Sequence, residues 1–131
     1  NKDRKKVQTS ADAYNILLNN HDDGTIDYTE TFKVLYMNQG CQVLGCFTIS
    51  EGGITNTLAD VRMILQGALL TNAVAMILAH NHPSGSTRPS REDDELTRKV
   101  VDAARLLDIK VADHIILTSE DFYSYNDEGR I

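Results

Sequence analysis

The sequence predicts a single α/β domain in which helices flank a mixed β-sheet. Three observations lead to this prediction. The length of 131 residues suits one domain with a hydrophobic core and is too short for two ordinary domains. Hydrophobic residues make up 41% and charged residues 24% of the chain, as in soluble globular proteins. Helical and extended patterns follow one another in the order α, β, β, α, β, α, β, β, which favours a sheet flanked by helices.

The first half of the predicted domain contains a helix and a hairpin. Ser10 is a good N-cap for a helix that runs to about Asn20. The segment ETFKVLYM, residues 30–37, alternates as a strand, and a turn at NQG leads into a second strand, CQVLGCFTIS, residues 41–50. Alternate residues of a strand share one face, so Glu30 would lie on the same face as Phe32, Val34 and Tyr36. We therefore expect its carboxylate to point toward a largely apolar face. Residues 1–9 are expected to form a flexible extension, and residues 10–131 the domain.

The second half alternates helices with strands. After a glycine-containing loop, EGGITNT at 51–57, residues 58–72 predict a helix, and AVAMILA at 73–79 predicts a strand that is covered on both faces. A third helix follows Ser90, then a strand, IKVADHIIL at 109–117, and a short strand with a turn at the end. The expected buried stripes are Leu58, Val61, Leu65, Ala68 and Leu69 in the second helix, and Leu96, Val100, Ala103, Ala104 and Leu107 in the third.

Charge, hydropathy and cysteine placement narrow the class of protein. The net charge of −6 opposes a broad nucleic-acid surface, because such surfaces use Lys and Arg to neutralise phosphates. The basic residues that could still contact nucleic acid are Lys2 to Lys6, Arg88, Arg91, Arg98 and Lys99. The longest apolar run, residues 73–79, is far shorter than the roughly 20 residues of a membrane span, and no apolar stretch follows the basic start NKDRKK, so no signal peptide is expected. Cys41 and Cys46 would point to opposite faces of one strand, which indicates reduced cysteines and a cytoplasmic protein.

The segment AHNHPSGSTRPSRED, residues 79–93, carries the candidate chemistry. His80 and His82 end the apolar strand and project to the same side, while Asn81 points away. Pro83 helps to end the strand, and Asp93 falls in the first turn of the third helix. Two imidazoles and one carboxylate suit a hydrolytic zinc ion, which takes three protein ligands and leaves a position for water.

Each of these residues also has a structural interpretation that stays open. Ser90 and Asp93 have the spacing of a helix capping box. The two histidines alone are a weak metal signal, and Glu30 could be a solvated acid at a strand end. As a functional residue, Glu30 would transfer protons, since burial would raise its pKa toward the working range. The capping interpretation does not account for the histidines.

The full spacing resembles a known signature. HNHPSGSTRPSRED is similar to the JAMM (JAB/MPN) metalloprotease motif, His-x-His-Pro, six residues, Ser, two residues, Asp. The run AHNHPSG, followed by PSRED, LTRKV and DHIIL, resembles the bacterial RadC family over about residues 10–131. The resemblance implies a JAB/MPN fold of the cytidine-deaminase-like type. It implies Zn²⁺ held by His80, His82 and Asp93, Ser90 as support for the oxyanion, and Glu30 as general base.

The chain departs from the family pattern in two places. Many members have Pro-Arg-Glu where this chain has Val61, Arg62 and Met63. This chain therefore lacks one carboxylate that could compete with Glu30 for the role of general base. The helix-hairpin-helix segment at the front of full-length members has no counterpart here, so a nucleic-acid role that rests on it is not implied. Asp94 is the alternative third ligand, His114 is expected to be a hydrogen-bonded structural histidine, and His21 a turn residue.

Three functions follow from these residues. The first is a zinc-dependent hydrolase, a metallopeptidase of the JAMM type, acting on a peptide or isopeptide bond of a peptide or protein substrate. The alternative is a DNA repair or recombination accessory factor, in which the metal domain is a binding module. A third is a metal-stabilised scaffold without catalysis, against which the retained site residues argue. A zinc deaminase is disfavoured because its Pro-Cys-x-x-Cys segment is missing. The sequence predicts no oligomeric state.

Overall fold

The order of helices and strands is the one that the sequence predicts. A computed structural model describes residues 4–21, 26, 28–52 and 59–131. Its helices are α1 (Ser10–Asn19), α2 (Val61–Thr71) and α3 (Arg91–Arg105). Its strands are β1 (Thr31–Met37), β2 (Val43–Glu51), β3 (Ala75–Asn81), β4 (Lys110–Leu117) and β5 (Phe122–Ser124). The predicted loop at 51–57 lies mostly outside the described residues.

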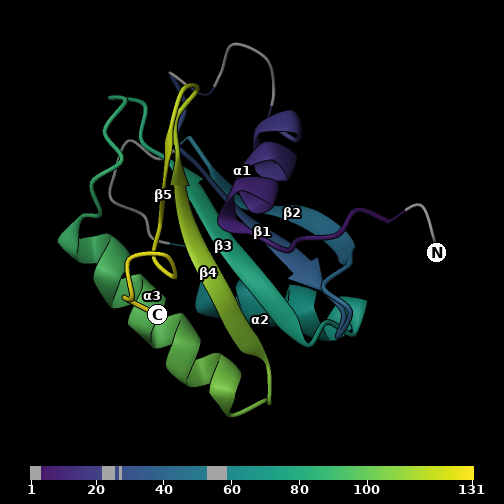
Figure 1. The fold of residues 1–131 in the computed structure, drawn as a ribbon. Coiled ribbons are helices and arrows are strands. Elements are labelled where there is room, and N and C mark those ends of the chain that lie inside the picture. Colours follow the sequence, from purple (N-terminus) through teal and green to yellow (C-terminus); the bar gives the residue numbers. More distant parts are fainter. Residues whose placement is uncertain (1–3, 22–25, 27, 53–58) are drawn as a thin grey trace.

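The strands form one mixed sheet in the order β2-β1-β3-β4-β5 (Figure 1). Strand β1 is antiparallel to both of its neighbours, β3 and β4 are parallel, and β5 is antiparallel to β4. The hairpin β1–β2 and the crossover through α3 account for these directions, because parallel neighbours need a long connection. The predicted α/β domain with a mixed sheet flanked by helices is confirmed.

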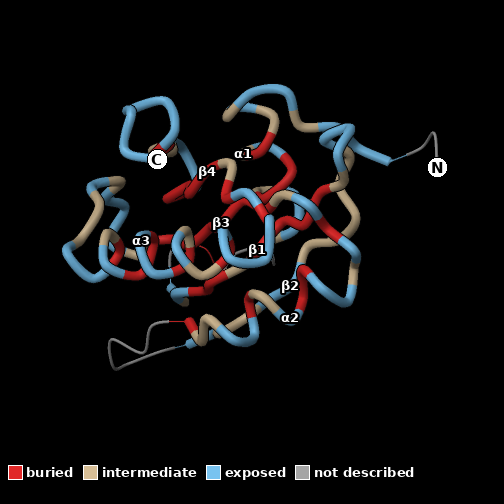
Figure 2. The backbone as a smooth tube through the Cα atoms, turned by 90° about the horizontal axis from the view of Figure 1, so that it is seen from below, coloured by how far each residue is buried: buried red, intermediate tan, exposed pale blue. Residues whose placement is uncertain are grey.

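Helices cover both faces of the sheet (Figure 2). Helices α2 and α3 bury Ile64, Ala68, Leu96 and Val100 against one face, where they meet Val34, Met76 and Leu78. Helix α1 buries Ala13, Ile16 and Leu17 against the other face, where they meet Leu35, Ile77 and Ile115. Strand β3 contributes to both clusters, which confirms that its continuous apolar run marks a strand buried on both faces.

Three local expectations need correction. The N-cap of α1 is Thr9 and not Ser10, since the Thr9 side chain accepts from the Asp12 N–H. In α2, Ala68 is buried and Val61 and Leu65 pack against the core as expected, and Leu58 lies outside the described residues. Leu69 is 58% exposed, and Gly67 packs against Tyr36 instead. In α3, Leu107 lies beyond the helix end and is exposed.

Other expectations about the chain can be compared directly with the structure. Cys41 and Cys46 are both free thiols. Residues 5–7 lie beside residues 41–43, with hydrogen bonds from Val7 N to Cys41 O and from Val43 N to Lys5 O. In the described part of the chain, no helix has both the length and the apolar character needed to cross a membrane.

Candidate metal centre

The sheet brings one end of each of three elements together. Phe32 near the start of β1 is the register partner of His80 near the end of β3, so the residue before β1 reaches the carboxyl end of β3. The chain leaves β3 at Asn81 and enters α3 at Arg91, which places the first turn of α3 beside the same edge. Residues that lie about 50 positions apart in the sequence therefore meet at this edge.

His80 and His82 face one another through their Nε2 atoms. The two Nε2 atoms are 2.9 Å apart, as expected for side chains two residues apart at a strand end. The other nitrogen of His82, Nδ1, lies 3.0 Å from the backbone carbonyl oxygen of Ser86. Because a carbonyl can only accept, Nδ1 of His82 donates to it, and Nε2 is the nitrogen of this ring that faces His80 and Asp93.

Asp93 completes this group from the first turn of α3. Its Oδ1 lies 3.0 Å from Nε2 of His80 and its Oδ2 lies 3.2 Å from Nε2 of His82. Burial raises the pKa of the Asp93 carboxyl, but the hydrogen bonds from the two histidines outweigh burial and leave this pKa well below its usual range. The same hydrogen bond to Asp93 raises the pKa of His82.

Asp94, the alternative third ligand, points elsewhere. Its carboxylate accepts a hydrogen bond from the Tyr125 hydroxyl at 2.7 Å and pairs with Arg130 at 2.6 Å. One residue along an α-helix turns a side chain by about 100°, so Asp93 and Asp94 cannot both face the histidines. The structure thus places Asp93, and not Asp94, beside His80 and His82.

Glu30 lies close to the histidine pair. One ligand atom from each of Glu30, His80 and His82 falls within 4.8 Å of the other two, so these three residues form a candidate metal group. Glu30 is exposed and precedes β1. The burial expected for Glu30 is therefore wrong, because the residue precedes β1. Its carboxylate still lies beside His80, the ring that stacks on Phe32.

Ser90 is the N-cap of α3 and is bound to Asp93 in both directions. The Ser90 hydroxyl oxygen accepts from the Asp93 N–H at 3.1 Å, and the Ser90 N–H donates to Asp93 Oδ2 at 2.7 Å. The predicted capping box is confirmed. The cap does not compete with the histidines, because the Asp93 carboxylate contacts Ser90 and both imidazoles together.

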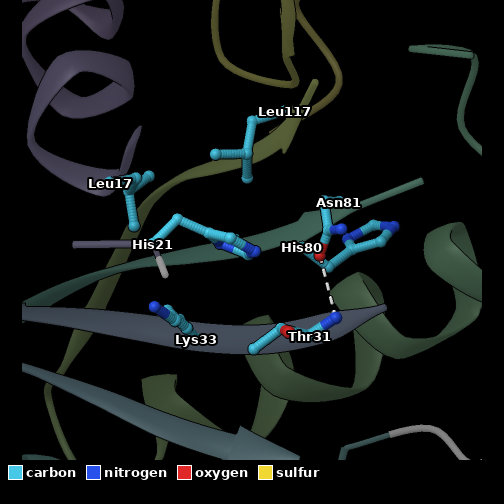
Figure 3. A pocket seen from close by; sticks show the side chains of 8 residues that line it. Leu17, His21, Thr31, Lys33, His80, Asn81 and Leu117 are labelled. Atoms are coloured by element: carbon cyan, nitrogen blue, oxygen red, sulfur yellow. Dashed lines mark hydrogen bonds between the residues drawn. The ribbon is translucent and has the colours of Figure 1, made fainter. Parts of the chain in front are cut away.

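Asn81, between the two histidines, has a role that the sequence analysis missed. Its Oδ1 accepts from the Thr31 N–H at 2.8 Å (Figure 3), and its Nδ2 donates to the carbonyls of Thr29 and Ile26 at 2.7 and 2.8 Å. These bonds hold the backbone on both sides of Glu30. The available signal was an amide side chain within an apolar strand, since a buried polar group must find partners nearby.

Asn81 also lines a small pocket on the side of the sheet that α1 covers. Leu17, His21 and Lys33 line this pocket as well (Figure 3). His21 is half-buried in the bend after α1, in agreement with its prediction as a turn residue. This pocket is too small to hold more than a water-sized group, because its volume is only about 10 Å³.

His114 and Thr97 lie behind His80. Nε2 of His114 is 2.9 Å from Nδ1 of His80, and Nδ1 of His114 is 2.6 Å from the Thr97 hydroxyl. His114 is fully buried, and burial together with the neighbouring His80 lowers its pKa well below the usual range. It is the hydrogen-bonded histidine that the sequence predicts, but its partner is a residue of the candidate site.

A β-bulge turns His114 toward the site. Val111 pairs with Met76 and packs on the α2–α3 face, but the next pairs are Asp113 with Ile77 and His114 with Leu78. The additional residue in β4, Ala112, reverses the alternation. Without it, Asp113 would share the face of Val111, and His114 would face α1.

The donor set fits a divalent cation of the zinc type. Two imidazole nitrogens and a carboxylate lie within 3.2 Å of one another, and nitrogen and carboxylate ligands are those that Zn²⁺ takes in catalytic sites. The second nitrogen of each histidine has its own partner, at Ser86 and His114, as is usual for metal-binding histidines.

Comparison with known proteins identifies the family. Residues 7–130 match the family model described as the RadC-like JAB domain. A UPF0758 protein of Flavobacterium johnsoniae is 39% identical over 125 residues, which are 95% of this chain and 53% of that protein. The UPF0758 protein YfjY of Escherichia coli K12 is 43% identical over 100 residues, 76% of this chain and 62% of that protein.

A third relative, a UPF0758 protein of Porphyromonas gingivalis, is 44% identical over 101 residues, 76% of this chain and 44% of that protein. The chain spans about half the length of these curated relatives. The five-stranded mixed sheet with its three flanking helices agrees with a JAB/MPN-like fold. This chain therefore belongs to the RadC family, and its residues 7–130 are a RadC-like JAB domain.

Proposed function

We propose that this domain is a zinc-dependent hydrolase that cleaves a peptide or isopeptide bond. The observation that carries the proposal is the convergence of His80, His82 and Asp93, with the exposed carboxylate of Glu30 beside the two histidines. In this proposal the three converging side chains hold the ion. Zinc, when bound at such a site, polarises a carbonyl group and makes water a stronger acid.

Glu30 is the proton carrier in this proposal. Its carboxylate takes a proton from the attacking water as the water oxygen bonds to the carbonyl carbon, and gives that proton to the nitrogen as the C–N bond breaks. Its exposure suits this task, since an accessible carboxylate can reach substrate and exchange protons with solvent. Asn81 supports the role by holding the backbone of Thr29 and Thr31 on either side.

Ser90 and the first turn of α3 stabilise the developing negative charge. Helix N-termini favour anions because their first N–H groups have no partner within the helix. Ser90 occupies the N-cap beside Asp93, and in this proposal its hydroxyl donates to the substrate oxygen as that oxygen becomes negative. Preorganised donors of this kind accelerate acyl transfer because they need no rearrangement during the reaction.

The experiment compares Glu30→Gln with the wild type. We expect Glu30→Gln to bind Zn²⁺ about as tightly as the wild type, measured by competition with a chromophoric chelator. We expect its turnover of a quenched-fluorescent peptide library to fall by about 10²–10⁴-fold, the usual contribution of a general base. Glu51→Gln is the matched control, because Glu51 is also exposed and is the register partner of Thr31.

Two results would overturn the proposal. The first is a wild-type protein that purifies without zinc and binds none at micromolar concentrations. The second is equal turnover by the wild type and Glu30→Gln, which would remove Glu30 from its role. The alternative of a DNA accessory factor predicts binding that weakens steeply with salt, whereas the net charge of −6 predicts weak binding by this domain, so a gel-shift series over salt tests it directly.

A further inference from the structure

A chain of three hydrogen bonds connects two of the residues in the candidate metal centre. Nδ1 of His80 lies 2.9 Å from Nε2 of His114. Nδ1 of His114 lies 2.6 Å from the hydroxyl oxygen of Thr97, and this hydroxyl lies 2.6 Å from the backbone carbonyl of Asp93. The chain therefore runs from the side chain of His80 to the backbone of Asp93 through two buried groups, the His114 ring and the Thr97 hydroxyl.

The hydrogens of this chain can be assigned from its acceptor end. The Asp93 carbonyl can only accept, so the single hydroxyl hydrogen of Thr97 lies between the two oxygens. The Thr97 oxygen must then accept from His114, and Nδ1 of His114 carries a hydrogen. Because His114 is fully buried beside His80, its neutral ring has no second hydrogen, so Nε2 accepts from His80.

The opposite direction of donation is unfavourable. If Thr97 donated to His114, its oxygen and the Asp93 carbonyl oxygen would face one another at 2.6 Å with no hydrogen between them. His114 would then donate from Nε2, and His80 would carry its hydrogen on its own Nε2. That is the atom directed toward His82 and Asp93, where a hydrogen would prevent cation binding.

We propose that His114 and Thr97 are positioning residues that hold His80 with its hydrogen on Nδ1, so that the Nε2 lone pair faces the cation site. This inference rests on the proposed zinc site but concerns the chain's own hydrogen bonds. His82 obtains the same form from a nearby carbonyl, that of Ser86. His80 lies within the sheet, where the backbone carbonyls accept hydrogen bonds from neighbouring strands. Its Nδ1 therefore has a side-chain partner instead, His114 of the adjacent strand β4.

The surrounding rings fix the geometry of this chain. Tyr125 stacks on His114 with ring centroids 4.8 Å apart and planes within 10°. Phe32 stacks on His80 with centroids 6.0 Å apart and planes within 8°. With both ring planes held in this way, the two imidazoles meet through their nitrogen atoms. The same chain joins β3, β4 and α3, so it also sets the distance between His80 and Asp93.

The first test reads the hydrogen positions in the metal-free protein. Long-range ¹H–¹⁵N correlation spectra of ¹⁵N-histidine-labelled protein, recorded at mildly alkaline pH, distinguish protonated from bare ring nitrogens. We expect Nδ1 of His80 and Nδ1 of His114 to be protonated in the wild type. A wild-type spectrum in which His80 carries its hydrogen on Nε2 and none on Nδ1 overturns the inference without any variant.

The second test removes the hydroxyl of Thr97. Thr97→Ser keeps the hydroxyl, whereas Thr97→Val keeps the shape and leaves His114 Nδ1 without an acceptor. We expect Thr97→Val to populate the form of His80 protonated on Nε2 and to bind Zn²⁺ about 10–100-fold more weakly, the usual cost of losing a partner of a metal ligand. Thr97→Ser should restore both measurements.

Thr71→Val is the matched control for the loss of a helical threonine hydroxyl. Thr71 donates to the carbonyl four residues before it, Gly67, at 2.8 Å, as Thr97 does to Asp93. The hydrogen-bond partners of the Thr71 hydroxyl, the carbonyls of Gly67 and Ala68, both belong to α2. We expect Thr71→Val to leave the His80 spectrum and the zinc affinity unchanged.

The outcomes separate this inference from the proposed function. Equal zinc affinity and equal spectra for Thr97→Val and the wild type would overturn the inference and leave the zinc site intact. The expected spectra in a wild-type protein that binds no zinc would support the hydrogen-bond chain and overturn the proposed function.

Discussion

Two helices of this protein begin with the same capping motif and differ in what the motif faces. In α1, Thr9 is the N-cap, and the Asp12 carboxylate accepts from the backbone N–H groups of Gln8 and Thr9 at 2.9 and 3.1 Å. In α3, Ser90 is the N-cap, and the Asp93 carboxylate accepts from the Ser90 N–H and contacts two imidazoles as well. The comparison shows that a capping box is a local structure that tertiary contacts can extend into a site.

The difference lies in the surroundings of the two carboxylates. Asp12 faces the backbone of the segment before its own helix, where partners are neutral amides. Asp93 is 8% exposed and faces the end of β3, where His80 and His82 leave the sheet. A buried carboxylate needs partners that compensate for lost hydration, and the imidazoles supply them in this structure. Each of the next three predictions tests the comparison by changing both motifs in the same way.

The largest expected effect is on zinc affinity. Asp93→Ala removes one of the three proposed ligands, so we expect the zinc affinity to fall by more than about 100-fold, beyond the usual cost of changing a ligand's partner. Asp12→Ala should leave it unchanged. Chelator competition with both purified variants checks this. Equal affinities for the two variants would contradict the assignment of Asp93.

The next effect is the stabilisation of the fold by zinc. A ligand that binds only the folded state at about 100 times its dissociation constant adds about 2.7 kcal/mol to the free energy of unfolding. We expect this gain in the wild type and in Asp12→Ala, and little gain in Asp93→Ala at the same zinc concentration. Urea titrations with zinc and with a chelator measure it. If Asp93→Ala gained as much as the wild type, zinc would be binding elsewhere.

The smallest effect is the loss of the cap itself, for which the two motifs should behave alike. Ser90→Ala and Thr9→Ala each remove a hydroxyl that accepts from a first-turn N–H at 3.1 Å. We expect each to lower the free energy of unfolding by about 1 kcal/mol, measured by urea titration of the metal-free proteins. A cost several times larger for Ser90→Ala would mean that its hydroxyl does more than cap the helix.

Much of the fold follows from local patterns in the sequence. The element order is correct because each strand and helix here has its own hydrophobic period, which needs no knowledge of its neighbours. The capping box of α3 is correct because Ser90 and Asp93 are three residues apart, and such bonds form within one turn. In the stripe of α2 the prediction for Leu69 is wrong, because the helix turns Gly67 toward Tyr36, and this close approach depends on a distant strand.

The candidate site divides in the same way. The spacing of His80, His82 and Asp93 indicates a zinc-type donor set, and the sequence also indicates that Asn81 points away from the pair. The burial expected for Glu30 is wrong, since the alternation of β1 starts after it. The sequence showed nothing of the hydrogen bonds from Asn81 to Thr29 and Thr31, because those partners lie about 50 residues away.

By itself, the sequence determined the local elements, the cap of α3 and the kinds of side chain that gather after β3. The tertiary structure decided which acid faces the histidines, because the direction of α3 turns Asp93 toward them and Asp94 toward Arg130. It also decided that His114 reaches His80, because the additional residue in β4 reverses the alternation. Helix direction and strand register depend on packing between distant segments, and a local pattern carries no information about that packing.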